Sequence, residues 1–106
     1  MFLDYIVNTP VSVRGDIVPW IICADGFRLS VQASKYHYCT PRDDYGPWSE
    51  VEVGYPLQEE PLLFPYADDP DRPTGIFAYV PIEVVRRVID KHGGAIAWMG
   101  FRELHE

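Results

Sequence analysis

The sequence predicts one α+β domain spanning residues 1–106, in which a mostly antiparallel sheet of about five strands carries one helix on one face. Three observations predict this fold class. The chain of 106 residues is long enough for one hydrophobic core and too short for two. Several short β-rich segments are separated by turn residues. One segment near the C-terminus spaces its apolar residues as a helix does.

The first predicted strands surround a hairpin. Residues 2–7 (FLDYIV) are predicted to form a short strand. In residues 16–34 two β-rich runs flank Ala-Asp-Gly, and Asp-Gly is typical of a hairpin turn because glycine adopts the required positive φ. Pro19 cannot donate to a β-ladder, so we expect the first run to begin at an edge or a bulge. The second run alternates between a core face (Phe27, Leu29, Val31, Ala33) and a solvated face (Arg28, Ser30, Gln32, Ser34).

Two further strands enclose a proline-rich segment. Residues 49–55 alternate valine with glutamate, and residues 75–80 (GIFAYV) are β-rich, so both are predicted strands. The intervening residues 56–75 hold five prolines and are predicted to form a long ordered loop that inserts Leu62, Leu63 and Phe64 into the core. Loops of this length in small domains are often functional.

Residues 81–92 predict the helix. Pro81 suits the first helical position, and Gly93-Gly94 provides the stop. We expect an apolar stripe toward the sheet (Ile82, Val85, Val88, Ile89) and two i,i+4 ion pairs (Glu83 with Arg87, Arg86 with Asp90). Residues 95–101 are predicted to form the last strand, and residues 102–106 a frayed tail.

The net charge of −7 is unevenly distributed. Residues 43–71 contain nine Asp or Glu and no Lys or Arg, whereas the remaining residues carry seven acids and nine bases. Such a segment repels a phosphate backbone, so no direct nucleic-acid binding is expected. It would attract a basic protein surface or a cation. A solubilising loop remains the alternative interpretation.

Other classes of protein are disfavoured by simple counts. No apolar run approaches the roughly 20 residues that span a bilayer, and residues 1–10 have no basic region ahead of their apolar residues. We therefore expect a cytoplasmic protein without a membrane segment. Cys23 and Cys39 are expected to be reduced and buried. A structural zinc ion needs four ligands, and the pair His37 and Cys39 has no close companions, so no metal or other cofactor is expected.

Residues 30–48 hold the densest group of polar and aromatic side chains, and more than one chemistry is open to them. Ser34 or Cys39 with His37 would form a nucleophile and base, oriented by Asp43 or Asp44, but no Gly-x-Ser-x-Gly elbow is present. Residues 68–71 (DDPD) would suit calcium but lack the remainder of an EF-hand loop.

Two further interpretations use the aromatic residues. An aromatic pocket with cationic corners would stack a nucleotide base and pair its phosphate, although a packed sheet face explains the same tyrosines. Its residues would be Arg28, Gln32, Arg42, Tyr36, Tyr38 and Trp48. A protein interface is the leading interpretation, because Tyr, Trp and Arg dominate interface energetics and an acidic rim orients docking. The predicted partner-binding residues are Tyr36, Tyr38, Arg42, Asp43, Asp44, Trp48, Glu50, Glu52, Asp68 and Asp69, with no catalytic residue.

Several short strings resemble a family of small proteins encoded by phages and prophages. They are SVQAS (30–34), YHYC (36–39), Pro41-Arg42, VEVGYP (51–56), Tyr79-Val80-Pro81 and His92-Gly93-Gly94. The resemblance covers residues 26–94 and indicates a genomic setting, not a reaction, so no catalytic residue is carried over.

The resemblance implies an accessory factor in the cytoplasm of a host bacterium. It implies an inhibitor of host defence, similar to anti-CRISPR proteins, whose acidic face occupies the basic channel of a defence protein or nucleoprotein complex. A phage protein that sequesters a small nucleotide signal is the alternative, and a small enzyme using His37 and Cys39 is a second one. We also expect a homodimer through an edge strand beginning near Pro19 or through the last strand.

Overall fold

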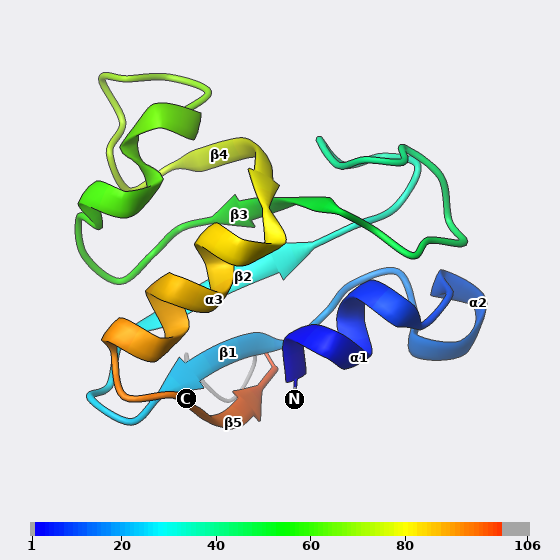
Figure 1. Ribbon diagram of the computed structural model, residues 1–106, viewed down its shortest axis with the longest axis horizontal. Coiled ribbons are helices and arrows are strands. Elements are labelled where there is room, and N and C mark those ends of the chain that lie inside the picture. The colour runs from blue at the N-terminus through cyan, green and yellow to red at the C-terminus, as the bar shows by residue number, and fades with distance from the viewer. Residues whose placement is uncertain (1, 101–106) are drawn as a thin grey trace.

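The computed structural model describes residues 2–100 and contains one five-stranded antiparallel sheet in the order β4-β3-β2-β1-β5 (Figure 1). The α+β fold class is therefore confirmed. The strands are β1 (Trp20–Cys23), β2 (Arg28–Gln32), β3 (Glu50–Gly54), β4 (Ile76–Pro81) and β5 (Ala95–Met99). The helices are α1 (Phe2–Asn8), α2 (Val11–Arg14), α3 (Ile82–Lys91) and the 3₁₀ helix η1 (Pro61–Tyr66).

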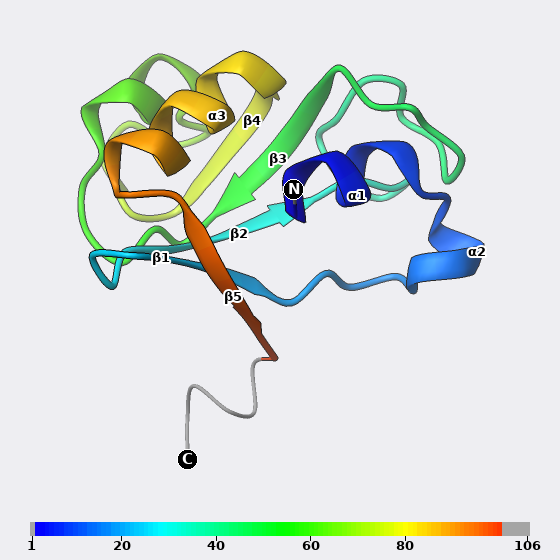
Figure 2. The same cartoon turned by 60° about the horizontal axis from the view of Figure 1, so that its bottom comes forward.

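Two helices cover one face of the sheet. α1 packs on β2 and α3 packs beside β4 and η1, and the opposite face carries no helix in the described part of the chain (Figure 2). The covered face is apolar because alternate strand residues point into it, which removes them from water. These core residues are Ile21, Cys23, Leu29, Val31, Val51, Val53, Phe77 and Val80, and all are buried.

The N-terminal segment is a helix, so the prediction of a strand at residues 2–7 was wrong. Leu3, Ile6 and Val7 are buried, and this spacing of three and four residues is helical. The side chain of Asn8 closes the last turn by donating to the carbonyl of Asp4 at 2.9 Å. In so short a run, β-propensity and helical period compete, and docking on the sheet decides between them.

The hairpin of residues 16–34 is confirmed. β1 and β2 pair antiparallel, with Ile21 opposite Leu29, and Gly26 in the turn has φ +93°. Pro19 lies just before β1, so it does not have to donate a hydrogen bond to the β-ladder. β1 pairs with β2 and also with β5, so the expectation of an edge near Pro19 was wrong. The edges of the sheet are β4 and β5.

The proline-rich segment contains η1, which packs beside β4. Leu63 is fully buried and Leu62 partly so, whereas Phe64 is exposed, so the predicted insertion of Phe64 into the core was wrong. Glu60 begins η1 and accepts a hydrogen bond from the backbone N–H of Leu62 at 3.0 Å.

The helix predicted at residues 81–92 is confirmed as α3, with Pro81 at its N-cap and positive φ at Gly93 and Gly94. The predicted i,i+4 ion pairs do not form. Arg86 instead bonds Asp4 of α1 at 2.6 Å and lies 3.6 Å from Glu83, because the docked α1 brings a carboxylate within its reach.

The last predicted strand is present as β5, which ends at Met99, while residues 101–106 lie outside the described residues. No helix among residues 2–100 has the length and apolar content needed to cross a membrane.

Candidate functional site

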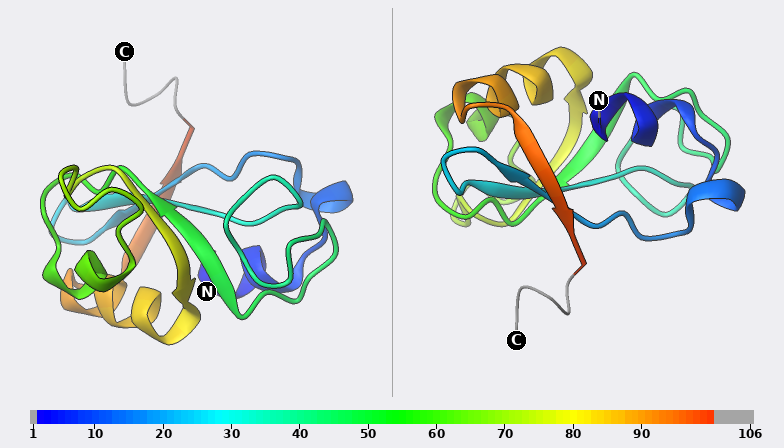
Figure 3. Two further views of the ribbon diagram at one scale, coloured as in Figure 1. Left: turned by 90° about the horizontal axis from the view of Figure 1, so that it is seen from above. Right: turned by 90° about the horizontal axis from the view of Figure 1, so that it is seen from below.

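The segment between β2 and β3 forms a large loop at the end of the sheet opposite η1 (Figure 3). Its first turn is closed by Ser34, whose hydroxyl accepts the N–H of Tyr36 at 3.0 Å and lies 2.7 Å from Nδ1 of His37. Thr40 then forms a bridge with Glu50, donating its N–H to the Glu50 carbonyl at 3.0 Å. These contacts hold the loop against β3.

Glu50 and Glu52 point away from the covered face, since Val51 and Val53 between them are in the core. Glu52 Oε1 accepts the N–H of Tyr38 at 3.3 Å, and Oε2 lies 4.0 Å from Nε2 of His37. The Glu52 side chain is only 16% exposed. Glu52 therefore anchors the loop over the sheet and offers little surface to a partner.

Asp43 and Asp44 also form hydrogen bonds within the loop. Asp43 Oδ1 accepts the N–H groups of Tyr45 (2.8 Å) and Gly46 (3.1 Å). Asp44 Oδ1 accepts the N–H of Lys35 at 2.9 Å. Both side chains are half-buried. They stabilise turns, as aspartates commonly do, and contribute their charge to the surface from there.

Trp48 does not belong to the surface, although the sequence placed it among the partner-binding residues. It is 3% exposed and packs in the hydrophobic core. The Arg14 guanidinium lies 5.0 Å from its ring centroid. A large aromatic ring gains more from burial than from exposure, and the loop folds around it. We therefore remove Trp48 from the candidate interface.

The loop and the neighbouring strands β3 and β4 together form what we call the Tyr38 patch, defined as Tyr38, Tyr79, Arg42 and Glu50. The ring centroids of Tyr38 and Tyr79 are 5.9 Å apart, and the Arg42 guanidinium lies 5.3 Å from the Tyr38 ring. The N–H of Tyr79 donates to the carbonyl of Tyr38 at 3.0 Å. Tyr36, in the same loop, is 74% exposed. The patch is a group of exposed aromatic rings beside a carboxylate.

Sequence reasoning missed Tyr79 because strict alternation along β4 places it on the covered face with Phe77. In the structure the register shifts: Val53 pairs with Phe77, but Val51 pairs with Val80. Two β4 residues therefore oppose Glu52, which is a β-bulge, and bulges redirect side chains. No signal in the sequence marks this extra residue.

Asp68 and Asp69 lie apart from the Tyr38 patch. They follow η1, and the N–H of Asp68 bonds the carbonyl of Ile76, at the far end of β4. Both are exposed and line a shallow hollow of about 190 Å³ with Tyr55 and Arg72. The acidic segment thus reaches both ends of β3 and β4.

The geometry does not favour catalysis by Ser34, His37 or Cys39. Ser34 is 2% exposed, and its hydroxyl already caps a turn. Cys39 is buried, its Sγ donates to the carbonyl of Ser34 at 3.1 Å, and burial raises the pKa of its thiol. Neither group is an exposed, activated nucleophile.

The residues of the predicted nucleotide pocket do not converge. Arg28 stacks over Trp20 at 5.9 Å, at the opposite end of β2 from the loop. The Gln32 amide is bonded to the N–H and carbonyl of Val18 at 2.9 and 2.8 Å. With Trp48 in the core, three of the six residues thus lie away from the Tyr38 ring that Arg42 contacts. Both cysteines are buried and unpaired.

A buried polar cluster outside the loop was not predicted. His92 Nδ1 lies 2.6 Å from Asp25 Oδ2, and His92 Nε2 lies 2.8 Å from Glu60 Oε1. Lys91 Nζ donates to Glu60 Oε2 at 2.9 Å, and the His92 ring stacks on Phe27 with centroids 3.9 Å apart. The cluster joins the hairpin, α3 and the start of η1.

The cluster lowers the pKa of both of its carboxylates, Glu60 and Asp25. Burial raises the pKa of Glu60, but hydrogen bonds from Leu62, Lys91 and His92 outweigh it and hold that pKa below its usual value. The N–H of Phe27 and then His92 lower the pKa of Asp25. Glu60 is 1% exposed, so this ionised acid serves as a structural tie.

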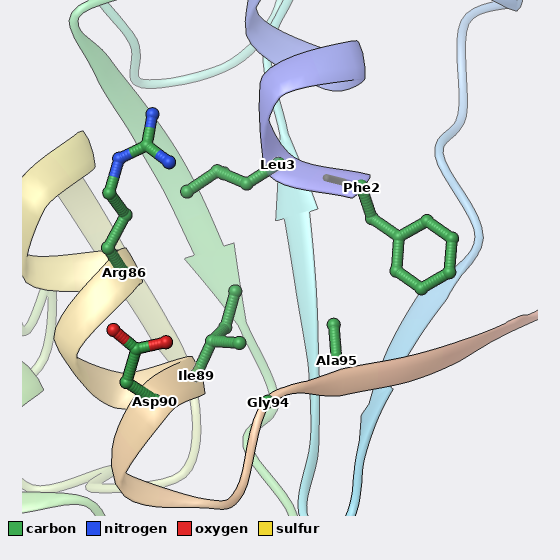
Figure 4. A pocket seen from close by; sticks show the side chains of 7 residues that line it. All are labelled: Phe2, Leu3, Arg86, Ile89, Asp90, Gly94 and Ala95. Carbon is green, nitrogen blue, oxygen red and sulfur yellow. The ribbon is translucent and has the colours of Figure 1, made fainter.

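A hollow of about 260 Å³ lies between α1, α3 and the start of β5 (Figure 4). Phe2, Leu3 and Ile89 give it apolar walls, and Arg86 and Asp90 stand one turn apart on α3. Arg86 already pairs with Asp4, so it offers no uncompensated cation. Among residues 2–100, no three His, Cys, Asp or Glu side chains are grouped so as to hold a metal ion.

Comparisons of the chain with protein-family models, with curated proteins and with solved structures found no match.

Proposed function

We propose that the protein is a non-enzymatic phage accessory protein that inhibits a bacterial defence system, as anti-CRISPR proteins do. It would dock an acidic, aromatic-rich face on a basic nucleic-acid-binding surface of the host protein. The observation that carries the proposal is the concentration of acids in residues 43–71, which hold nine Asp or Glu and no Lys or Arg, beside exposed tyrosines. The phage and anti-defence setting rests on the family resemblance.

The geometry supports a single docking face. Glu50 and Gly54 mark the two ends of β3, which are separated by about 13 Å at 3.3 Å per residue. The Tyr38 patch lies at one end and Asp68 with Asp69 at the other. A standard interface buries about 800 Å² on each partner, so one partner surface of ordinary size would cover both.

The mechanism would be stoichiometric competition. A channel that holds nucleic acid is lined with Lys and Arg, and carboxylates on the inhibitor would pair with those cations in place of phosphate. The charge would accelerate docking, and the exposed rings of Tyr36, Tyr38 and Tyr79 would supply the buried contact area. The cluster of Asp25 with the buried Glu60 and His92 would hold η1, and with it Asp68 and Asp69, in place.

The experiment is a plaque assay on bacteria with active CRISPR immunity that express the protein or its variants. We expect the unaltered protein to restore phage plating. The triple variant Glu50→Lys, Asp68→Lys, Asp69→Lys should lose this effect. The control Asp16→Lys, Glu83→Lys, Asp90→Lys changes three exposed acids by the same total charge and should retain it.

Two results would contradict the proposal. One is full inhibition by the triple variant, since the acidic face would then be dispensable. The other is a failure of the unaltered protein to restore plating in any immune strain. Far-UV circular dichroism of each variant ensures that a lost effect is not a lost fold.

A further inference from the structure

Tyr79 has a backbone conformation that a bulky residue rarely adopts. Its φ is +52°, in the left-handed region, within the bulge of β4. A left-handed residue in a bulge is ordinarily glycine, which has no Cβ to clash with the following carbonyl. A tyrosine at this position is strained where a glycine would not be.

The ring of Tyr79 meets that of Tyr38 without being covered. The interplanar angle between the rings is 39°, and the side chains remain 42% and 37% exposed, respectively. The bulge therefore presents two adjacent aromatic surfaces to solvent.

One of these surfaces already holds a guanidinium. Arg42 lies over the Tyr38 ring at 5.3 Å, and among residues 2–100 no carboxylate is within 4.0 Å of it. Its contact with the ring is a cation–π interaction. Within the chain, the Tyr38 ring therefore already contacts a guanidinium.

The negative charge around the two rings suits a cationic side chain from a partner. Glu50 Oε1 accepts the hydroxyl of Thr40 at 2.7 Å, which leaves Oε2 for another donor. Glu52, which accepts the backbone N–H of Tyr38, adds negative potential and has no Lys or Arg partner among the described residues. A planar guanidinium can stack on a ring and pair with a carboxylate at once, whereas an ammonium is a strongly hydrated point charge.

We infer that the Tyr38 patch selects arginine over lysine side chains on a protein partner, and that a partner arginine displaces Arg42 and stacks against both the Tyr38 and the Tyr79 ring. This inference rests on the proposed docking function and specifies the chemistry of its partner.

The test uses two fluorescently labelled peptides of equal charge, nona-arginine and nona-lysine, with binding followed by fluorescence anisotropy at low salt. We expect the unaltered protein to bind nona-arginine about fivefold more tightly, which corresponds to about 1 kcal/mol of stacking. Tyr79→Gly should remove this preference and leave nona-lysine binding unchanged. Tyr79→Phe, which keeps the ring, should retain it. Arg42→Ala should strengthen nona-arginine binding by removing the competing guanidinium.

Tyr55→Gly is the matched control. Tyr55 also has a positive φ, +50°, and an exposed ring, but it lies at the far end of β3. Its replacement releases the same backbone strain and removes the same ring elsewhere, so the arginine preference should persist. Tyr79→Asn, which tolerates the left-handed region without an aromatic ring, replaces Tyr79→Gly if the latter folds poorly.

The outcomes separate this inference from the proposed function. Equal binding of the two peptides, or an arginine preference that survives Tyr79→Gly, overturns arginine selection. The acidic docking face would still stand if binding of both peptides were lost in the triple variant Glu50→Lys, Asp68→Lys, Asp69→Lys. Binding of neither peptide by the unaltered protein overturns both.

Discussion

Replacing Glu60 with alanine should cost this small domain a large share of its stability. The buried carboxylate accepts hydrogen bonds from the N–H of Leu62, from Lys91 Nζ and from His92 Nε2, at 3.0, 2.9 and 2.8 Å. Lys91 is half exposed and can return to water at little cost. His92 is 8% exposed and would keep only Asp25 as its partner.

The magnitude follows from these differences. Breaking a buried pair by removing one partner costs about 3–5 kcal/mol, and a lost helix cap costs about 1 kcal/mol. Since Asp25 still holds His92, we expect the lower end, about 3 kcal/mol. With an m-value of about 1.5 kcal/mol per molar urea, the unfolding midpoint should fall by about 2 M.

The assay is urea unfolding at neutral pH, followed by tryptophan fluorescence and circular dichroism. Glu59→Ala is the matched control, because Glu59 is exposed and is the neighbouring residue of the same type. We expect the control to stay within about 0.5 kcal/mol of the unaltered protein. If Glu60→Ala unfolds at the same urea concentration as Glu59→Ala, the hydrogen bonds of Glu60 do not stabilise the fold.

Three other predictions test the same structure. The pKa values of Glu60 and Asp25 are lowered in the folded protein, so the stability that these carboxylates contribute is present above the unfolded-state pKa of about 4 and is lost as pH falls through the folded-state values. Acid unfolding of Glu60→Gln should therefore be less steep than that of the unaltered protein. Identical acid-unfolding profiles would contradict this expectation. Gly46 has a φ of +69°, and Gly46→Ala places a Cβ 2.6 Å from the Trp48 ring. This variant should lower the free energy of unfolding by about 2 kcal/mol more than Gly15→Ala, because Gly15 also has a positive φ but has open space around it. Equal losses of stability would show that Trp48 does not pack against Gly46. Burial raises the pKa of Cys23 to about 11 and also raises that of Cys39, so both thiols should react with iodoacetamide at pH 8 only as the protein unfolds, and fast labelling of the folded protein would contradict their burial.

The strands and α3 could be predicted because each carries its own periodic signal. Alternation of apolar and polar residues assigned Leu29 and Val31 to the core, and the Asp-Gly turn located the hairpin. The four-residue spacing of Val85 and Ile89 marked the buried side of α3. α1 lacked such a signal, because seven residues are too few to separate a helical period from β-propensity.

The candidate site was less predictable. The sequence placed Tyr36, Tyr38 and Arg42 in one exposed group, and the structure keeps them in the loop between β2 and β3. It could not assign Trp48 to the core, since burial of one aromatic among many depends on which elements close around it. No pattern in the sequence predicted that Tyr79 is exposed, because it reaches the surface through a one-residue change of register.

The sequence alone determined the composition of the surface: a net charge of −7, concentrated in residues 43–71, and the local periods that build the sheet and α3. Only the tertiary structure decided which of those acids are exposed and which tie the fold together. Glu52 bonds a residue 14 positions away, and Glu60 meets a histidine 32 positions away. Such contacts depend on how distant segments pack, and no local pattern encodes them.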